Sequence, residues 1–167
     1  MDFKEGKDKF IQAWGNLGSS WGVSRTMAQI HALLLISAEP LSTDDIMKEL
    51  EISRGNANMN LRALMDWGIV FKVSKAGERM EYFVSEKDIM QIATQVAKER
   101  RKRELEPVLK MLNQVKEIKP GKSKEANEFK KVTSELNDFA TKADNMLDTF
   151  IKAEEHWFFG KLFKFIK

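Results

Sequence analysis

The sequence contains no cysteine among its 167 residues, which excludes a disulfide scaffold, a zinc ribbon and thiol catalysis. Its two histidines, His31 and His156, are far apart, so no histidine-based metal site is expected. The sequence also lacks a nucleophile elbow and a dinucleotide-binding fingerprint. We therefore expect a protein that is not an enzyme and that uses no metal or cofactor.

Long hydrophobic runs are missing as well. The longest aliphatic run, residues 32–36, is much shorter than the roughly 20 residues that cross a bilayer. The first residues alternate in charge and lack the apolar centre of a signal peptide. These absences predict a soluble, cytoplasmic protein.

The chain has no large excess of charge of either sign. Twenty-eight Lys and Arg oppose 25 Asp and Glu, for a formal net charge of +3. Any affinity for nucleic acid must therefore come from a local patch. Hydrophobic residues make up 43% of the sequence, and nine glycines and three prolines are too few for a largely disordered chain.

Most of the sequence has the composition and apolar spacing of helices. Two β-branched and aromatic segments, residues 69–73 and 80–84, flank a polar tip that contains a glycine, which predicts a β-hairpin. Helices are expected over residues 2–17, 24–37, 42–50 and 53–67, again after residue 85, and from residue 123 onward.

Local signals mark where several of these elements begin and end. Ser42 with Asp45, and Ser85 with Asp88, have the spacing of a capping box. Gly68 follows the helix that Ser53 is expected to cap, at a position where a left-handed residue often ends a helix.

The order of these elements predicts a helix-turn-helix followed by a wing. In its second helix, Ala57, Leu61 and Leu64 are expected to face inward. The opposite face then carries arginine and asparagine side chains, which can pair with guanine and adenine in the major groove. The residues of this helix predicted to contact DNA are Ser53, Arg54, Asn56, Asn58, Met59 and Arg62.

Further contacts are expected to hold the protein on the DNA backbone. Thr43 begins the preceding helix and can donate to a phosphate, as can Ser53. The wing bases Lys72, Lys75 and Arg79 are expected to meet phosphates or to enter the minor groove. Gly55 would let a phosphate approach the helix start closely.

Two other interpretations of the same pattern stay open. Asparagine-rich helix starts also occur as ordinary caps and solvated faces, and some winged helices bind proteins instead of DNA. However, three asparagines in five helical positions are poor helix formers, a conflict with local preference that indicates function.

The stretch from Phe10 to about Asp88 resembles the winged helix-turn-helix regulators of the MarR superfamily, and more closely their GbsR-type branch. The matching residues are Trp14-Gly15, Gly18, Arg25, Ile30, Pro40-Leu41-Ser42, Asp45-Ile46, Leu50, Ile52-Ser53-Arg54-Gly55, Asn58 to Leu64, Trp67 to Val70, Gly77-Glu78-Arg79 and Tyr82. The resemblance implies a homodimeric transcriptional regulator that binds a pseudo-palindromic operator and dimerises through its terminal helices, and we expect it to act as a repressor. It does not extend beyond about residue 105.

The resemblance also bears on four aromatic residues, because some GbsR-like regulators respond to quaternary ammonium compounds, which aromatic cages bind. The effector-binding candidates are Trp14, Trp21, Phe71 and Phe83. Ordinary core packing is the alternative for these side chains, and we favour it.

The C-terminal third has a heptad pattern, with Phe129, Leu136, Ala143 and Phe150 recurring every seven residues. This pattern predicts a helix packed along another helix. Residues 156–167 combine aromatic residues with regularly spaced lysines, which fits a dimer-closing helix or an interfacial membrane helix. The basic run 98–103 fits either a phosphate-binding patch or a solvated helix face.

Together these observations predict a mainly helical fold with a small β wing. We expect an N-terminal supporting or dimerising helix over residues 1–23, a winged helix-turn-helix domain over 24–97, and a C-terminal helical dimerisation extension over 98–167. The expected partners are double-stranded DNA, a second copy of the chain and a small-molecule effector, with no membrane. A protein-interaction module and a membrane-surface protein anchored by its tail are the alternatives.

Overall fold

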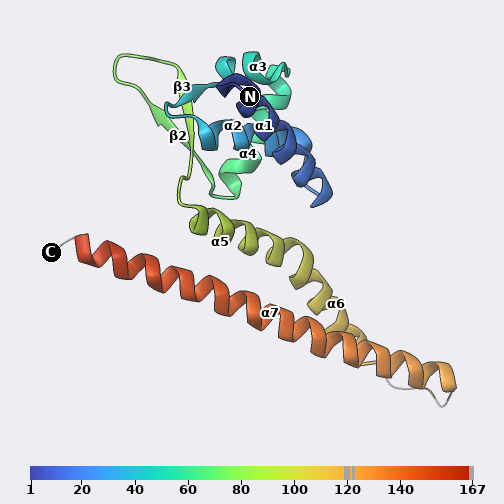
Figure 1. Cartoon of the computed structure of the whole chain (residues 1–167). Helices are drawn as coiled ribbons and strands as arrows, with labels where there is room; N and C mark the ends of the chain where they lie inside the picture. Colours follow the sequence, from blue (N-terminus) through green and yellow to red (C-terminus); the bar gives the residue numbers. More distant parts are fainter. Residues whose placement is uncertain (119–120, 122, 166–167) are drawn as a thin grey trace. The chain divides into compact units, whose positions relative to one another are not determined.

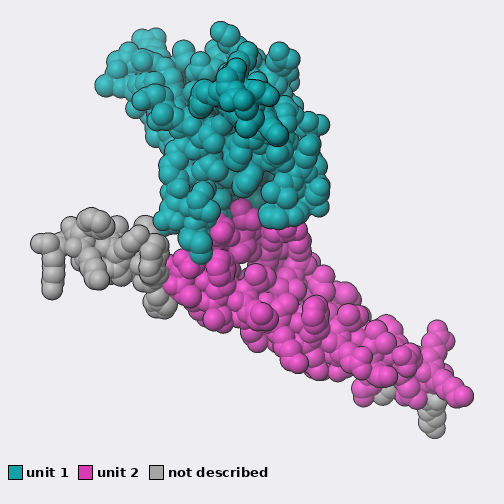
Figure 2. All heavy atoms as spheres, in the orientation of Figure 1, with its two compact units in different colours: residues 1–92 teal, residues 93–167 magenta. Residues whose placement is uncertain are grey.

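The computed structural model describes residues 1–118, 121 and 123–165, with side chains described as far as residue 154. The chain forms two compact units, residues 1–92 and residues 93–167 (Figure 2). The first unit contains α1 (Phe3–Ser20), α2 (Arg25–Ile36), β1 (Leu41–Ser42), α3 (Thr43–Leu50), α4 (Arg54–Asp66), β2 (Val70–Ser74) and β3 (Glu81–Ser85) (Figure 1). These are followed by α5 (Ile89–Arg100), the π-helical turn η1 (Arg101–Leu105), α6 (Glu106–Lys116) and α7 (Lys124–Phe165).

This arrangement confirms the predicted fold, a mainly helical winged helix-turn-helix with a long C-terminal helix. The three strands form an antiparallel sheet in the order β1-β3-β2. Phe71 of β2 lies opposite Val84 of β3, as the hairpin prediction requires. Strand β1 was not predicted, because two residues are too short to show an alternating pattern, and Leu41 pairs with Phe83 across the sheet.

Helix α2 is the centre of the first unit. Ile30, Leu33 and Leu34 are fully buried, together with Ile46 of α3 and Leu61 of α4. The wide apolar stripe of α2 therefore meets several elements at once. The C-terminal end of α2 is capped by a residue that is distant in the sequence.

The cap is the Lys87 ammonium group, which donates to the backbone oxygens of Leu34, Leu35 and Ser37 over 2.8, 2.7 and 2.8 Å. A cation at this end also interacts favourably with the negative end of the helix dipole. Desolvation lowers the pKa of Lys87.

Two glycines allow α1 to pack closely on α2. A Cβ atom at Gly18 would lie 2.5 Å from the Cβ of Ala28, and one at Gly15 would lie 2.7 Å from the Cγ of Gln29. The methyl of Ala28 is attached directly to the backbone, so it cannot turn away. The contact between the two helices therefore depends on the absence of a side chain at residue 18.

Gly18→Ala is expected to lower the free energy of unfolding by about 1–3 kcal/mol, since an extra methyl overpacks this contact. Gly6→Ala in the same helix is the matched control, because a Cβ there meets nothing within 4 Å. The control should be neutral or stabilising by up to about 1 kcal/mol. Denaturant unfolding of both variants measures the difference, and equal effects would contradict the close-packing argument.

The helix caps were predicted with mixed success. Ser42 and Asp45 form the predicted capping box at the start of α3, and hydrogen bonds from Ser42 lower the pKa of Asp45. The box predicted from Ser85 and Asp88 is wrong. Asp88 itself caps α5, accepting from the N–H groups of Met90 and Gln91 at 2.9 and 3.2 Å.

Ser85 instead ends β3, where its hydroxyl donates to the backbone oxygens of Ile69 and Glu86. Ser85 and Asp88 have the spacing of a capping box, but β3 continues to residue 85, so Ser85 belongs to the sheet and not to the helix start.

In the second unit, α7 packs against α6 and η1. Pro107 is the second residue of α6, just after η1, and has no N–H for the carbonyl four residues earlier, which is consistent with a wider π-helical turn in place of a break. Arg101 of η1 binds Asp144 of α7 through two hydrogen bonds of 2.6 and 2.9 Å, and Asp148 through one of 3.1 Å. The hydrogen bond from Arg101 lowers the pKa of Asp144.

The heptad residues of α7 are largely left open by this packing. Asn137, Ala140 and Ile151 are buried, and Ala140 lies at the edge of the heptad face, one turn from Leu136. We call the exposed apolar residues of α7 the α7 row: Phe129, Val132, Leu136, Phe139, Met146 and Phe150. Phe139 is 71% exposed. Within the described residues, the predicted heptad face is therefore only partly covered.

Candidate nucleic-acid interface

Helices α3 and α4 meet at a tight corner, as predicted. Glu51 has a left-handed backbone with φ of 53°, and the N–H groups of Glu51 and Ile52 both bond to the carbonyl oxygen of Met47. Ser53 then caps α4 by accepting from the N–H of Asn56 at 3.3 Å. These local bonds set the direction in which α4 leaves the corner.

Helix α4 has the two faces that the sequence predicts. Ala57, Leu61 and Leu64 are buried to 1% exposure or less. Ser53, Arg54, Met59 and Arg62 are exposed, and Asn56 and Asn58 are half-buried. The start of the helix is therefore open to a binding partner, and the DNA contacts themselves stay predictions.

The third asparagine, Asn60, behaves differently from the other two. It is 3% exposed, and its Nδ2 donates to the backbone oxygen of Asn56 at 2.9 Å and to the Oδ1 of Asn56 at 2.7 Å. From the sequence, all three asparagines count as poor helix formers that indicate function, but only Asn56 and Asn58 are among the predicted DNA contacts. Their different exposure follows from helical spacing, because Asn60 lies beside Leu61 and Leu64 on the inward side.

The exposed start of α4 has one charged contact within the protein. Arg54 forms an ion pair with Asp44 of α3, and both side chains are more than half exposed. Such a pair contributes little to stability, so it can exchange for a contact with DNA at a small cost. Arg62 has no ion pair within the described part of the chain. A Cβ at Gly55 would meet nothing within 4 Å, so the space before the helix start is open.

The three basic residues of the wing have different surroundings. Lys72 pairs with Glu81 on the neighbouring strand, and the Nζ of Lys75 lies 4.2 Å from the centre of the Tyr82 ring. Arg79 is exposed in the loop between β2 and β3. The Tyr82 hydroxyl donates to Glu78, which raises the pKa of Tyr82. Lys75 is thus held against the sheet, and Arg79 is the more accessible base at the wing tip.

Thr43 is the first residue of α3 and is half-buried beside the capping serine. Its position at the helix start is the one expected from the sequence, and its contact with a phosphate stays a prediction.

The basic run 98–103 makes several contacts with acidic groups. Arg100 pairs with Glu104, and Arg103 pairs with Glu99, both within one helical turn. Arg101 is bound to α7 as described above. These pairs favour the solvated-face interpretation over a free phosphate-binding patch.

The four aromatic effector candidates have unlike environments. Trp14 is half-buried with its ring 5.5 Å from that of Phe10, and Phe83 is buried in the sheet. Trp21 and Phe71 are exposed. The four residues thus share no single environment in the described structure, and an aromatic cage formed by them stays a prediction.

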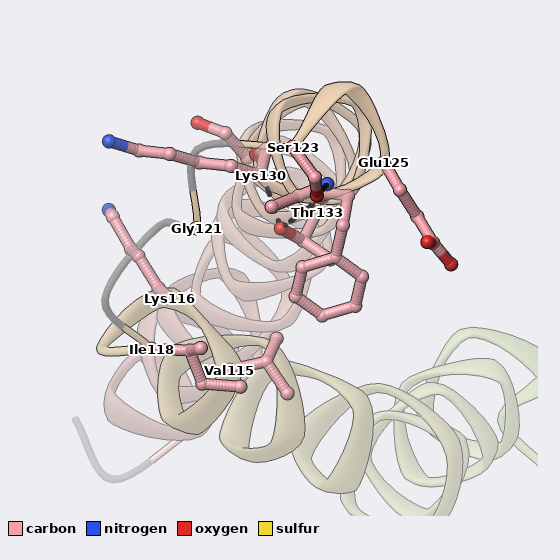
Figure 3. Close-up of a pocket in the computed structure, with 11 residues that line it drawn as sticks. Val115, Lys116, Ile118, Gly121, Ser123, Glu125, Lys130 and Thr133 are labelled. Atoms are coloured by element: carbon pink, nitrogen blue, oxygen red, sulfur yellow. Dashed lines mark hydrogen bonds between the residues drawn. The ribbon is translucent and has the colours of Figure 1, made fainter.

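Two cavities of the described structure are lined by other residues. One of about 290 Å³ lies among α1, α2 and α3, beside Gln12 and Gln29. The other, of about 380 Å³, lies where α6 and α7 meet (Figure 3). There Val115 and Ile118 form an apolar side, and Lys116 and Lys130 extend away from Glu125.

The described residues contain no cluster of histidine and acidic side chains arranged to bind a metal ion. No helix within them has a stretch long and apolar enough to cross a membrane. The side chains of residues 156–167, for which the sequence allows a dimer-closing or membrane-surface role, lie outside the described ones.

A comparison with protein families finds a match over the same helix-turn-helix region. The model of the MarR family matches residues 21–79, which include the helix-turn-helix and the start of the wing. A search of curated proteins finds no significant match. The GbsR-type branch is not identified by these comparisons and stays a prediction.

Three solved structures are similar to the chain at low sequence identity, and the first of them supports the fold. A crystal structure of a transcriptional regulator has a TM-score of 0.58 and 17% identity, covering 86% of this chain and 99% of that one. A mutant of MepR from S. aureus bound to an oligodeoxyribonucleotide has a TM-score of 0.42 and 13% identity, covering 84% and 94%. PerR from Streptococcus pyogenes, solved in a study of peroxide sensing and gene regulation, has a TM-score of 0.39 and 17% identity, covering 57% and 80%.

Proposed function

We propose that the chain is a MarR-type regulator that binds specific double-stranded DNA as a homodimer to control transcription. The MarR family model supports this through residues 21–79, which hold the helix-turn-helix and the start of the wing. The observation that carries the proposal is the open, polar start of α4, which follows the capped corner and projects Arg54, Asn58 and Arg62 outward. Such a helix start can enter a major groove and meet base edges. Repression, rather than activation, is the outcome we predict.

In this proposal the contacts divide into two kinds. Asn56, Asn58 and Arg62 read bases, joined by Arg54 once it leaves Asp44. Backbone phosphates are met by Thr43, Ser53 and the wing, where Arg79 and Lys72 are exposed. Phosphate contacts release counterions, so affinity should fall steeply as salt concentration rises. Absence of any salt-dependent DNA binding would instead favour a protein-interaction module.

The α7 row supports the homodimer. Its residues span roughly 30 Å of helix and expose aromatic and aliphatic side chains at heptad spacing. Heptad spacing suits another helix, and the side chains of the row are 37% to 75% exposed in the described part of the chain. A second α7 has the same row, so two copies can cover each other. Two recognition helices would then lie about 34 Å apart, or a multiple of that distance.

Asn58→Ala tests the base-reading role. We expect it to weaken binding to the selected operator by about 1–3 kcal/mol and to leave binding to random duplex DNA nearly unchanged, because a base contact carries sequence information and a phosphate contact does not. Fluorescence anisotropy titrations on both DNAs measure this. Asn16→Ala, an exposed asparagine of α1, is the control.

Equal weakening on operator and random DNA would reject base reading by Asn58. Regulation by a small-molecule effector stays a separate prediction, and titration of the DNA complex with candidate quaternary ammonium compounds would test it.

A further inference from the structure

Asn60 is a buried polar residue whose side chain makes two hydrogen bonds, although an apolar residue would fill the same position in the core. Its neighbours on the inward face of α4 are apolar, and burying an amide among them is costly unless the amide is bonded. Both N–H groups of its Nδ2 have partners, the backbone oxygen and the side-chain Oδ1 of Asn56. Asn60 is therefore tied to a half-buried residue that faces the proposed DNA site.

The two bonds determine how both amide groups are oriented. A backbone carbonyl can accept but not donate, so the atom of Asn60 that lies 2.9 Å from it must be Nδ2. The same Nδ2 lies 2.7 Å from the side chain of Asn56, so the Asn56 atom there must be an acceptor, its Oδ1. Turning either amide around would place two donors or two acceptors against each other.

The consequence for Asn56 is a fixed polarity. With its Oδ1 held by Asn60, its Nδ2 occupies the other branch of the amide and points away from that bond. A free asparagine can present either its donor or its acceptor to a base by rotating about its last bond. Asn56 cannot do so without breaking the bond from Asn60.

We infer that Asn60 is a positioning residue for sequence recognition: it holds the Asn56 amide so that Nδ2 is offered as a donor to an acceptor on a base edge. The inference rests on the proposed DNA-binding function. Acceptors in the major groove are the N7 atoms of purines, O6 of guanine and O4 of thymine, whereas the amino groups of adenine and cytosine donate. The operator position contacted by Asn56 should therefore favour an acceptor at the contacted point.

The inference is tested by selecting bound sites from random duplex DNA with the full chain and four variants. Asn56→Ala identifies the operator position that depends on Asn56. Asn60→Leu removes both bonds with an apolar side chain of similar size. In Asn60→Ser, the hydroxyl can still donate to the backbone oxygen of Asn56, but it cannot also bond to the Oδ1 of Asn56. The fourth variant combines Asn56→Ala with Asn60→Leu.

Both Asn60 variants are expected to lower the preference between bases at the Asn56 position by about threefold to tenfold, and to leave the other positions unchanged. In the Asn56→Ala background, Asn60→Leu should have no further effect on base preference. Thermal unfolding of each variant identifies any that fails to fold, in which case the other Asn60 variant decides.

An unchanged base preference at that position in a folded Asn60 variant would overturn the inference. So would an equal loss of preference at every position, because that indicates a general structural effect. If the unaltered chain selects no sequence at all, the proposed function fails instead, so the two failures can be told apart.

Discussion

Replacing Leu136 and Phe139 by glutamate is expected to convert the protein from a dimer to a monomer and to weaken operator binding by about 100-fold or more. Both side chains belong to the α7 row, and each buried side chain of this kind contributes about 1.5–3 kcal/mol. Charges in the middle of an apolar interface add a desolvation cost. A monomer carries one recognition helix, so it contacts one half-site and loses the energy of the other.

Sedimentation velocity and anisotropy titrations measure the two effects. The control variant places glutamate at Asn127 and Asn145, which are exposed on α7 outside the row, so the added charge is matched. This control should remain a dimer. A double variant of Leu136 and Phe139 that keeps the mass of the unaltered protein would exclude the α7 row as the dimer interface.

Lowering the pH from 7 to 4 is expected to reduce the free energy of unfolding by about 3 kcal/mol through one residue, His31. Burial in α2, followed by the charge of Lys87, lowers the pKa of His31 from 6.5 to about 4. The unfolded chain therefore takes up a proton near pH 6.5, and the folded protein resists it until about pH 4. Stability is fully present above pH 6.5 and falls as the pH drops through this range.

His31→Leu is the matched variant, because the Nε2 of His31 is buried without a hydrogen-bond partner among the described residues. Its stability should change little between pH 6.5 and 4.5. The carboxyl groups with lowered pKa, Asp45, Asp144 and Asp148, lose their contributions at lower pH, so they do not mask the effect between pH 6.5 and 4.5. Urea unfolding at several pH values measures it, and parallel slopes for the two proteins would contradict this account.

Local features of the fold were predictable because they act over three or four residues. The capping box of Ser42, the cap at Ser53 and the positive φ of Gly68 depend on side chains and backbone within one turn. The order of helices and strands followed from apolar spacing in the same way. The inward residues of α4 were predicted correctly, since one helix has one periodicity.

The failed predictions involve contacts between elements. Ser85 had the spacing of a helix cap, but pairing of β3 with β2 holds it in the sheet. The two residues of β1 form a strand because they pair with β3. Neither result can be read from a single segment, because the partner that decides it lies elsewhere in the chain.

The sequence by itself determined a winged helix-turn-helix and indicated which helix faces the proposed DNA site, since residue order and apolar period carry that information. The tertiary structure alone decided that Asn60 is buried and bonded to Asn56, and that the heptad face of α7 is only partly covered within the described residues. The physical reason is that periodicity identifies an apolar face, whereas packing decides what covers it and which polar groups must find partners beneath it.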